Sequence, residues 1–86
     1  MKRDMALVHA LLAWVEEHAA GPEVNPPTTI ANADAATTTY HVGLCVDAGY
    51  LDARQYGDRA RVTYGIRGLT WLGHDVLDAA RQAGDL

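Results

Sequence analysis

The chain has 86 residues, an apolar fraction of 49% and a formal net charge of −4. This length predicts a single domain covering residues 1–86, and the composition is normal for a globular protein, which excludes intrinsic disorder. No stretch approaches the ~18 consecutive apolar residues of a membrane span. The single Cys45 rules out an internal disulfide, so we expect a cytoplasmic protein.

The first predicted helix covers residues 4–19, and Asp4 can cap its start. Its apolar face is wide, and one stripe of that face contains Leu7, Leu11 and Trp14. Two interpretations are open. The helix is central and packs on two sides, or these three residues form an interface with a second copy of the chain, since aromatic residues are enriched at interfaces. Self-association stabilises small domains, so a homodimer is one expectation.

The segment after this helix contains Gly21, Pro22 and the adjacent Pro26 and Pro27, which keep it extended. The β-branched residues at 28–31 predict a short strand. A standard helix-turn-helix has a full helix at this place, before the recognition helix. The prolines therefore predict that this middle helix is reduced or lost.

The second predicted helix covers residues 34–48, with Asp34 as N-cap and Gly49 as the left-handed residue that ends it. Hydroxyls and rings near its start could contact phosphates or base edges of DNA. The same side chains could equally form a solvated helix start. The candidate DNA-reading residues are Thr37, Thr38, Tyr40 and His41.

A β-hairpin and a last helix complete the chain. Residues 50–56 predict one strand, and residues 61–67 predict a second, in which Val62, Tyr64 and Ile66 share a face. Gly57 marks the turn between them, and the last helix covers residues 71–83. Three helices with a hairpin wing indicate an α+β fold class and a small winged-helix-like domain.

Positive charge is concentrated on the predicted wing. Residues 50–69 hold four arginines and two aspartates, a local charge of +2, whereas the remainder holds three basic and nine acidic residues, a local charge of −6. The wing arginines are Arg54, Arg59, Arg61 and Arg67. They are candidates for phosphate contacts, and they could equally pair with carboxylates of the domain itself.

Catalytic and metal chemistry have little support. The chain contains no serine and no glycine-rich phosphate loop, so we expect no catalytic residues and no enzyme. His41 and Cys45 lie four residues apart on one helical face, but two ligands do not make a zinc site. We therefore expect neither a metal nor a cofactor. The simpler interpretation is that His41 bonds a partner near the core and that Cys45 packs as a small hydrophobe.

Trp71 and His74 lie on one side of the last helix, with Gly73 between them. They could form a recognition surface. The alternative is a polar seam where the last helix meets the first, with His74 bonding a carboxylate such as Asp4. Gly73 would let the helix backbone pack closely on a neighbour.

Three blocks of residues carry a family pattern. They are Lys2, Arg3, Asp4 and Met5; Tyr40, His41, Ala48 and Gly49; and Leu69, Thr70, Trp71, Gly73, His74, Leu77 and Asp78. In this order they resemble the bacterial and phage family called domain of unknown function 2513. The pattern departs at Tyr50 and at the small Gly43 and Cys45. The resemblance implies a winged-helix-like fold and a bacterial or mobile-element origin, and it implies no activity.

Two functions fit these patterns, because winged helices bind both DNA and protein. The first is a DNA-binding or transcription-regulator-like protein whose wing contacts phosphates; the wing arginines favour it, and the negative net charge weakens it. The alternative is a protein–protein interaction module, a phage or prophage accessory factor that contacts a host or phage protein. Neither function involves a membrane.

Overall fold

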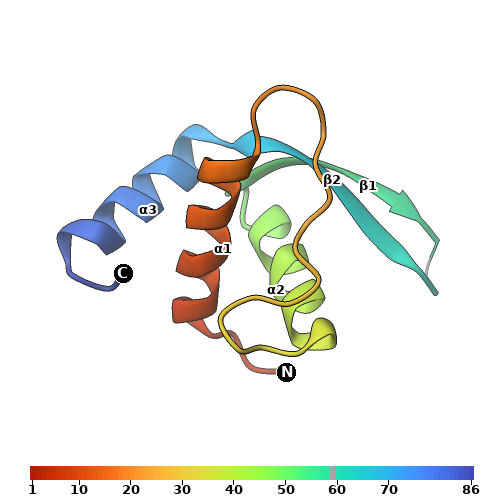
Figure 1. Ribbon diagram of the computed structural model, residues 1–86, viewed down its shortest axis with the longest axis horizontal. Coiled ribbons are helices and arrows are strands. Elements are labelled where there is room, and N and C mark those ends of the chain that lie inside the picture. Colours follow the sequence, from red (N-terminus) through yellow and green to blue (C-terminus); the bar gives the residue numbers. More distant parts are fainter. Residues whose placement is uncertain (59) are drawn as a thin grey trace.

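The computed structural model describes residues 1–58 and 60–86, which form three helices and one β-hairpin (Figure 1). The elements are α1 (Met5–His18), α2 (Ala35–Asp47), β1 (Leu51–Gly57), β2 (Val62–Leu69) and α3 (Trp71–Gln82). The three predicted helices and the two strands of the predicted hairpin are confirmed, and none of their boundaries differs from its prediction by more than two residues. The fold is therefore α+β, with the hairpin between α2 and α3.

Each helix begins at a side chain that satisfies its free amides. The Asp4 carboxylate accepts from the amides of Ala6 and Leu7, and the Asp34 carboxylate accepts from the Thr37 amide at 2.7 Å. These caps explain why the helix starts could be predicted from single residues, since the interaction is local.

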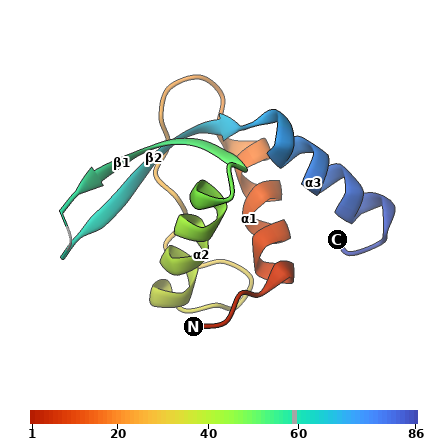
Figure 2. The same cartoon turned by 180° about the vertical axis from the view of Figure 1, so that it is seen from behind.

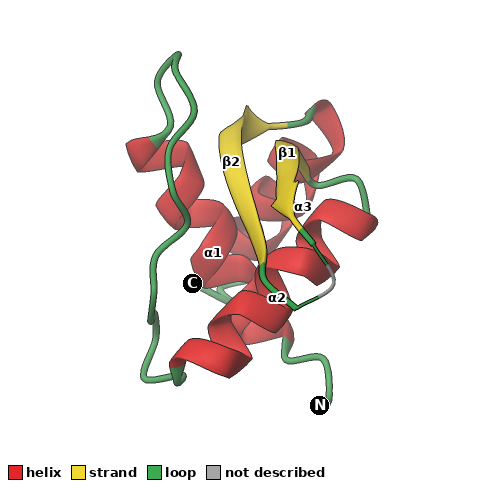
Figure 3. Cartoon of the chain, turned by 90° about the vertical axis from the view of Figure 1, so that its right-hand side faces the viewer, coloured by secondary structure: helices red, strands yellow, loops and turns green. Residues whose placement is uncertain are grey.

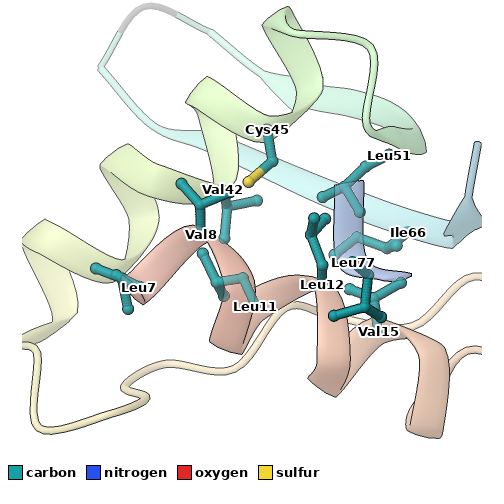
Figure 4. Packing of buried hydrophobic residues seen from close by; sticks show 10 residues of the cluster. All are labelled: Leu7, Val8, Leu11, Leu12, Val15, Val42, Cys45, Leu51, Ile66 and Leu77. Atoms are coloured by element: carbon teal, nitrogen blue, oxygen red, sulfur yellow. The ribbon is translucent and has the colours of Figure 1, made fainter. Parts of the chain in front are cut away.

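Helix α1 is the centre of the domain. Figures 1 and 2 show it between α2 and α3, with the hairpin crossing one end of the helical layer. Figure 4 shows how side chains of α1, α2, the hairpin and α3 meet in one core. Its buried apolar residues are Leu7, Val8, Leu11, Leu12, Val15, Val42, Cys45, Leu51, Ile66 and Leu77.

The interpretation of α1 as a central helix is thus confirmed. Leu7 and Leu11 are 4% and 1% exposed, so the core of their own chain uses them and they offer no surface to a second copy. Their assignment to a dimer interface is corrected accordingly. Trp14 is half-buried and stacks on the His18 ring, with centroids 4.3 Å apart.

The segment between α1 and α2 has no helix, so the predicted loss of the middle helix is confirmed. The predicted strand at 28–31 is wrong, because Ala31 and Asn32 adopt left-handed conformations with φ of 53° and 66°. A single residue, Val24, pairs instead with Ile66 through two backbone hydrogen bonds of 2.9 Å. Pro26 follows and has no N–H to continue such a ladder. The fold is winged-helix-like without its middle helix.

The wing is an antiparallel hairpin paired from Leu51 opposite Leu69 to Gly57 opposite Val62, with one irregularity after Asp52. Its two strands extend beyond the helices in Figure 1. Ile66 is fully buried and Tyr64 is half-buried on the inner face, as the alternation predicted.

The base of the hairpin is locked to the start of α3. The Thr70 amide donates to the Tyr50 carbonyl at 3.1 Å, and the Thr70 hydroxyl accepts from the Gly73 amide at 3.0 Å. The same Tyr50 carbonyl lies so close to Gly73 that a Cβ atom at position 73 would overlap it. The close packing expected at Gly73 is confirmed.

A polar seam joins α1 and α3. Arg81 donates two hydrogen bonds to the Glu16 carboxylate, at 2.8 and 3.3 Å, and His74 Nδ1 lies 4.0 Å from the same group. The hydrogen bonds from Arg81 hold the pKa of Glu16 below its usual value of 4.5, against a smaller opposite effect of burial. The predicted seam is confirmed, but its carboxylate is Glu16 rather than Asp4. Trp71 takes no part in the core and is 85% exposed.

We predict that Gly73→Ala lowers the free energy of unfolding by about 2 kcal/mol, because the added methyl group overlaps the Tyr50 carbonyl and displaces α3. The measurement is urea denaturation followed by circular dichroism. Gly68→Ala is the matched control, since a Cβ there meets open space, and it should change stability by less than about 0.5 kcal/mol. Equal effects of the two variants would contradict the tight contact at Gly73.

We predict that Glu16→Gln lowers the denaturation midpoint at neutral pH and that this difference disappears in acid. Because the pKa of Glu16 is lowered by folding, its contribution is complete above the usual value of 4.5 and is lost as the pH falls through the lowered value. The midpoints of wild type and variant, measured from pH 7 down to acid, should therefore converge. A difference that stays constant with pH would show that the ion pair contributes nothing.

Candidate functional site

Two of the four DNA-reading candidates on α2 are buried. Thr38 and His41 are 0% and 1% exposed, so the structure corrects their placement on the exposed part of the helix. The reason is periodicity, because residues 38, 41, 42 and 45 share one helical face and that face packs on α1. Thr37 is half-buried and Tyr40 is exposed.

His41 ties α2 to the start of α1. Its Nδ1 lies 2.9 Å from the Thr37 carbonyl oxygen and its Nε2 lies 2.9 Å from the Asp4 amide nitrogen. A carbonyl only accepts and a backbone amide only donates, so the ring is neutral with its proton on Nδ1. His41 is therefore a structural residue, as the simpler interpretation stated.

The exposed face of α2 carries no positive charge. Its solvent-facing side chains include Thr39, Tyr40 and Asp47, and the whole helix from Ala35 to Asp47 contains neither lysine nor arginine. In a DNA-binding winged helix this face is the one that enters the major groove. Here its only formal charge is negative.

This face of α2 and the inner face of the hairpin enclose a depression that we name the α2–wing groove. It has a volume of about 270 Å³ and adjoins a second hollow of about 360 Å³ on the far side of Val62 and Tyr64. The groove is lined by Thr39, Tyr40, Gly43, Leu44, Asp47, Gln55, Val62 and Tyr64.

Gly43 gives the groove its shape. A Cβ atom at this position would lie 3.1 Å from the Tyr64 hydroxyl, so the glycine lets the tyrosine ring lie against α2. This pair was not predicted from the sequence to be part of a site. A glycine inside a helix is a signal that could have found it, because glycine there costs about 1 kcal/mol and usually has a packing reason.

The groove is an unfavourable place for an anion. Burial raises the pKa of Tyr64, and the negative charge of Asp47 raises it further. Both effects oppose a second negative charge beside the tyrosine. The groove therefore suits an apolar or cationic group better than a phosphate.

The wing arginines point away from the groove. Arg54, Arg61 and Arg67 are exposed and alternate with the inner-face residues, which confirms the predicted arginine-bearing outer face for these three. Arg67 pairs with Asp52 at 3.0 Å, and the Arg54 guanidinium lies 5.5 Å from the centre of the Tyr56 ring. Arg59 lies outside the described residues.

Tyr56 and Glu23 brace the outer face of the wing. The Tyr56 hydroxyl donates to the Glu23 carboxylate at 2.6 Å, and this hydrogen bond raises the pKa of the tyrosine. The carboxylate lies over Gly65, where a side chain would collide with it. The long loop between α1 and α2 is thereby held against the hairpin at a second point besides Val24.

The remaining chemistry is limited. Within residues 1–58 and 60–86, no three His, Cys, Asp or Glu side chains are placed to hold a metal ion. Cys45 is buried, and burial raises the pKa of its thiol to about 12, which suppresses the reactive thiolate. None of the helices in this described part has both the length and the hydrophobicity for a membrane crossing.

Comparison with known proteins identifies relatives without an assigned activity. The family model described as "Hypothetical protein (DUF2513)" matches residues 2–84. An uncharacterized protein of Haemophilus influenzae is 31% identical over 81 residues, which cover 94% of this chain and 69% of that protein. No solved structure gives a significant match. The resemblance stated from the sequence blocks is confirmed.

We predict that His41→Leu lowers the free energy of unfolding by about 2 kcal/mol, because it leaves the Asp4 amide without its acceptor and removes the polar tie between α2 and the start of α1. The neighbouring Tyr40→Leu should change it by less than about 0.5 kcal/mol, since that side chain is exposed. Urea denaturation of both variants measures the difference. A larger loss for Tyr40→Leu would contradict the assignment of His41 as the structural tie.

Proposed function

The chain belongs to the DUF2513 family, and we propose that it is a winged-helix-like interaction module that binds a protein partner in the α2–wing groove. As part of this proposal it is a bacterial or phage accessory factor that works in the cytoplasm without catalysing a reaction. The proposal does not depend on a homodimer, which stays a prediction.

The observation that carries the proposal is the charge of the α2 face. A helix that reads DNA needs cationic contacts to the phosphates around it, because these supply most of the salt-dependent affinity. Helix α2 has no cation and ends with Asp47 beside the groove. An interface that lacks cations for phosphate and offers an apolar hollow fits a polypeptide better than a nucleic acid.

The groove also indicates which chemistry the partner has. Leu44, Val62 and the Tyr64 ring supply apolar walls, while Tyr40 stands exposed at the rim. Exposed tyrosines are common anchors at protein interfaces. Asp47 adds one negative charge, so we expect an apolar anchor flanked by a basic group on the partner.

DNA binding through the wing is the second candidate. Arg54, Arg61 and Arg67 are exposed on one face of the hairpin, which gives this part of the surface its positive character. Phosphate contacts of this kind position a protein without reading sequence. Arg67 is paired with Asp52, and Arg54 stacks on Tyr56. Both interactions reduce the availability of these guanidinium groups for phosphate contacts.

The direct test places a photocrosslinking amino acid at position 40, on the rim of the groove, in protein expressed in bacterial cells. We expect one protein to be crosslinked from this position and not from position 78, an exposed site on α3. Asp47→Lys should weaken the crosslink, and Asp78→Lys, the matched charge reversal, should leave it unchanged. Equal labelling from both positions, or equal effects of both reversals, would refute groove binding.

A DNA titration separates the two candidates. We expect no binding of mixed-sequence duplex DNA at low salt, because the protein is acidic and α2 lacks cations. Binding that weakens with salt and disappears in Arg54→Glu/Arg61→Glu would instead favour the wing as a phosphate-contacting surface. Fluorescence anisotropy of a labelled duplex measures this.

A further inference from the structure

The outer edge of β2 has main-chain groups that point away from β1. In the ladder, Gly65 lies opposite Arg54 and Thr63 lies opposite Tyr56. Two residues further along, the backbone groups of Asp58 and Arg61 donate to each other. Alternation then turns the amides and carbonyls of Val62, Tyr64 and Ile66 to the other side.

Along this edge of β2, only the end near Ile66 is paired in the described part of the chain. Ile66 exchanges both its hydrogen bonds with Val24 at 2.9 Å. Within residues 1–58 and 60–86, no hydrogen bond reaches the amides or carbonyls of Val62 and Tyr64 on this side. Two donors and two acceptors in extended conformation therefore remain beside a ladder that has already begun.

The chain itself does not continue that ladder. If residues after Val24 stayed in register with β2, position 26 would lie opposite Tyr64 and position 28 opposite Val62. Pro26 has no N–H for the Tyr64 carbonyl. Figure 3 shows the long loop on the side of β2 away from β1, and the hollow of about 360 Å³ lies between the two.

We propose that an extended peptide of another protein adds to β2 as a third, antiparallel strand, hydrogen-bonded to Val62 and Tyr64. This inference rests on the proposed interaction function and adds a second contact of the partner, at the hollow that adjoins the α2–wing groove. Strand addition at an open sheet edge uses main-chain hydrogen bonds for affinity and pockets for alternate side chains for specificity. Among the residues that the structure describes, the edge of β2 has both features, namely unpaired main-chain groups and an adjoining hollow.

The side-chain pattern of the peptide follows from the two faces of the sheet. Residues opposite Tyr64 and Val62 point towards the hollow lined by Pro26, Pro27 and Val42, so they are apolar. Residues opposite Thr63 and Arg61 point to the outer face. The one opposite the exposed Arg61 is acidic, because opposite charges across strands stabilise the pair.

The other edge of the hairpin fits less well. Ala53, Gln55 and Gly57 of β1 also turn main-chain groups outward, by the same alternation. The large hollow, however, is lined by β2 and the proline segment and not by β1. A paired residue, Val24, already sets the register on the β2 side alone.

The test is selection from a phage-displayed library of random linear peptides on the wild-type protein, with Val62→Pro in parallel. Proline is tolerated on an edge whose N–H faces solvent, so this variant removes an outward donor and keeps the hairpin bonds. Selected peptides should alternate apolar residues with an acidic one. They should bind Val62→Pro roughly tenfold more weakly, as expected for one lost hydrogen bond, and bind Asp78→Lys, a change on the exposed surface of α3, like wild type.

Amide hydrogen exchange gives a readout that does not depend on the variant folding. A selected peptide should slow exchange at Val62 and Tyr64 of the wild-type protein. Slowing at Ala53 and Gln55 instead, a helical spacing of apolar residues in the peptides, or equal selection by Val62→Pro would overturn the proposal. So would self-association of the protein through this edge. If crosslinking from position 40 still succeeds in those cases, the interaction function stands and only the strand mode fails.

Discussion

The arrangement of the domain depends on the contact between the Tyr50 carbonyl and the first turn of α3. This oxygen accepts the Thr70 amide and lies directly on Gly73. The contact closes the hairpin at its base, because Tyr50 precedes β1 and Thr70 follows β2. It thereby fixes where the wing leaves the helices and where α3 meets α1. A residue with a side chain at position 73 would separate these elements, so the whole layout requires a glycine there.

Local interactions explain what could be predicted from the sequence. The helix starts follow from Asp4, Asp34 and Thr70, each of which caps amides within three residues. The pairing of Val24 with Ile66 could not be predicted, because it joins residues far apart in the chain and involves a single position. The burial of His41 was one of two alternatives that the sequence left open, but its partner, the Asp4 amide at the start of α1, could not be predicted because it lies far away in the chain.

The candidate site was only partly predictable for the same reason. The absence of cations from α2 and their concentration on the wing are visible in the sequence. The groove is not, because Gly43 and Tyr64 come from different elements and meet only in the folded chain. The loss of the middle helix, in contrast, was signalled by the prolines. That loss leaves an extended segment beside β2, so the feature that removes one part of a DNA-binding motif also supplies one wall of the adjoining hollow.

Pro26 has a consequence for the control of this edge. A residue with an amide proton at position 26 could bond the Tyr64 carbonyl, and the loop would then close along β2 as an internal third strand. In the strand-addition mode that we propose, such a chain would occupy the peptide's place and be autoinhibited. Under that proposal the ring nitrogen of Pro26 leaves the edge open, without the stability that a complete sheet would add.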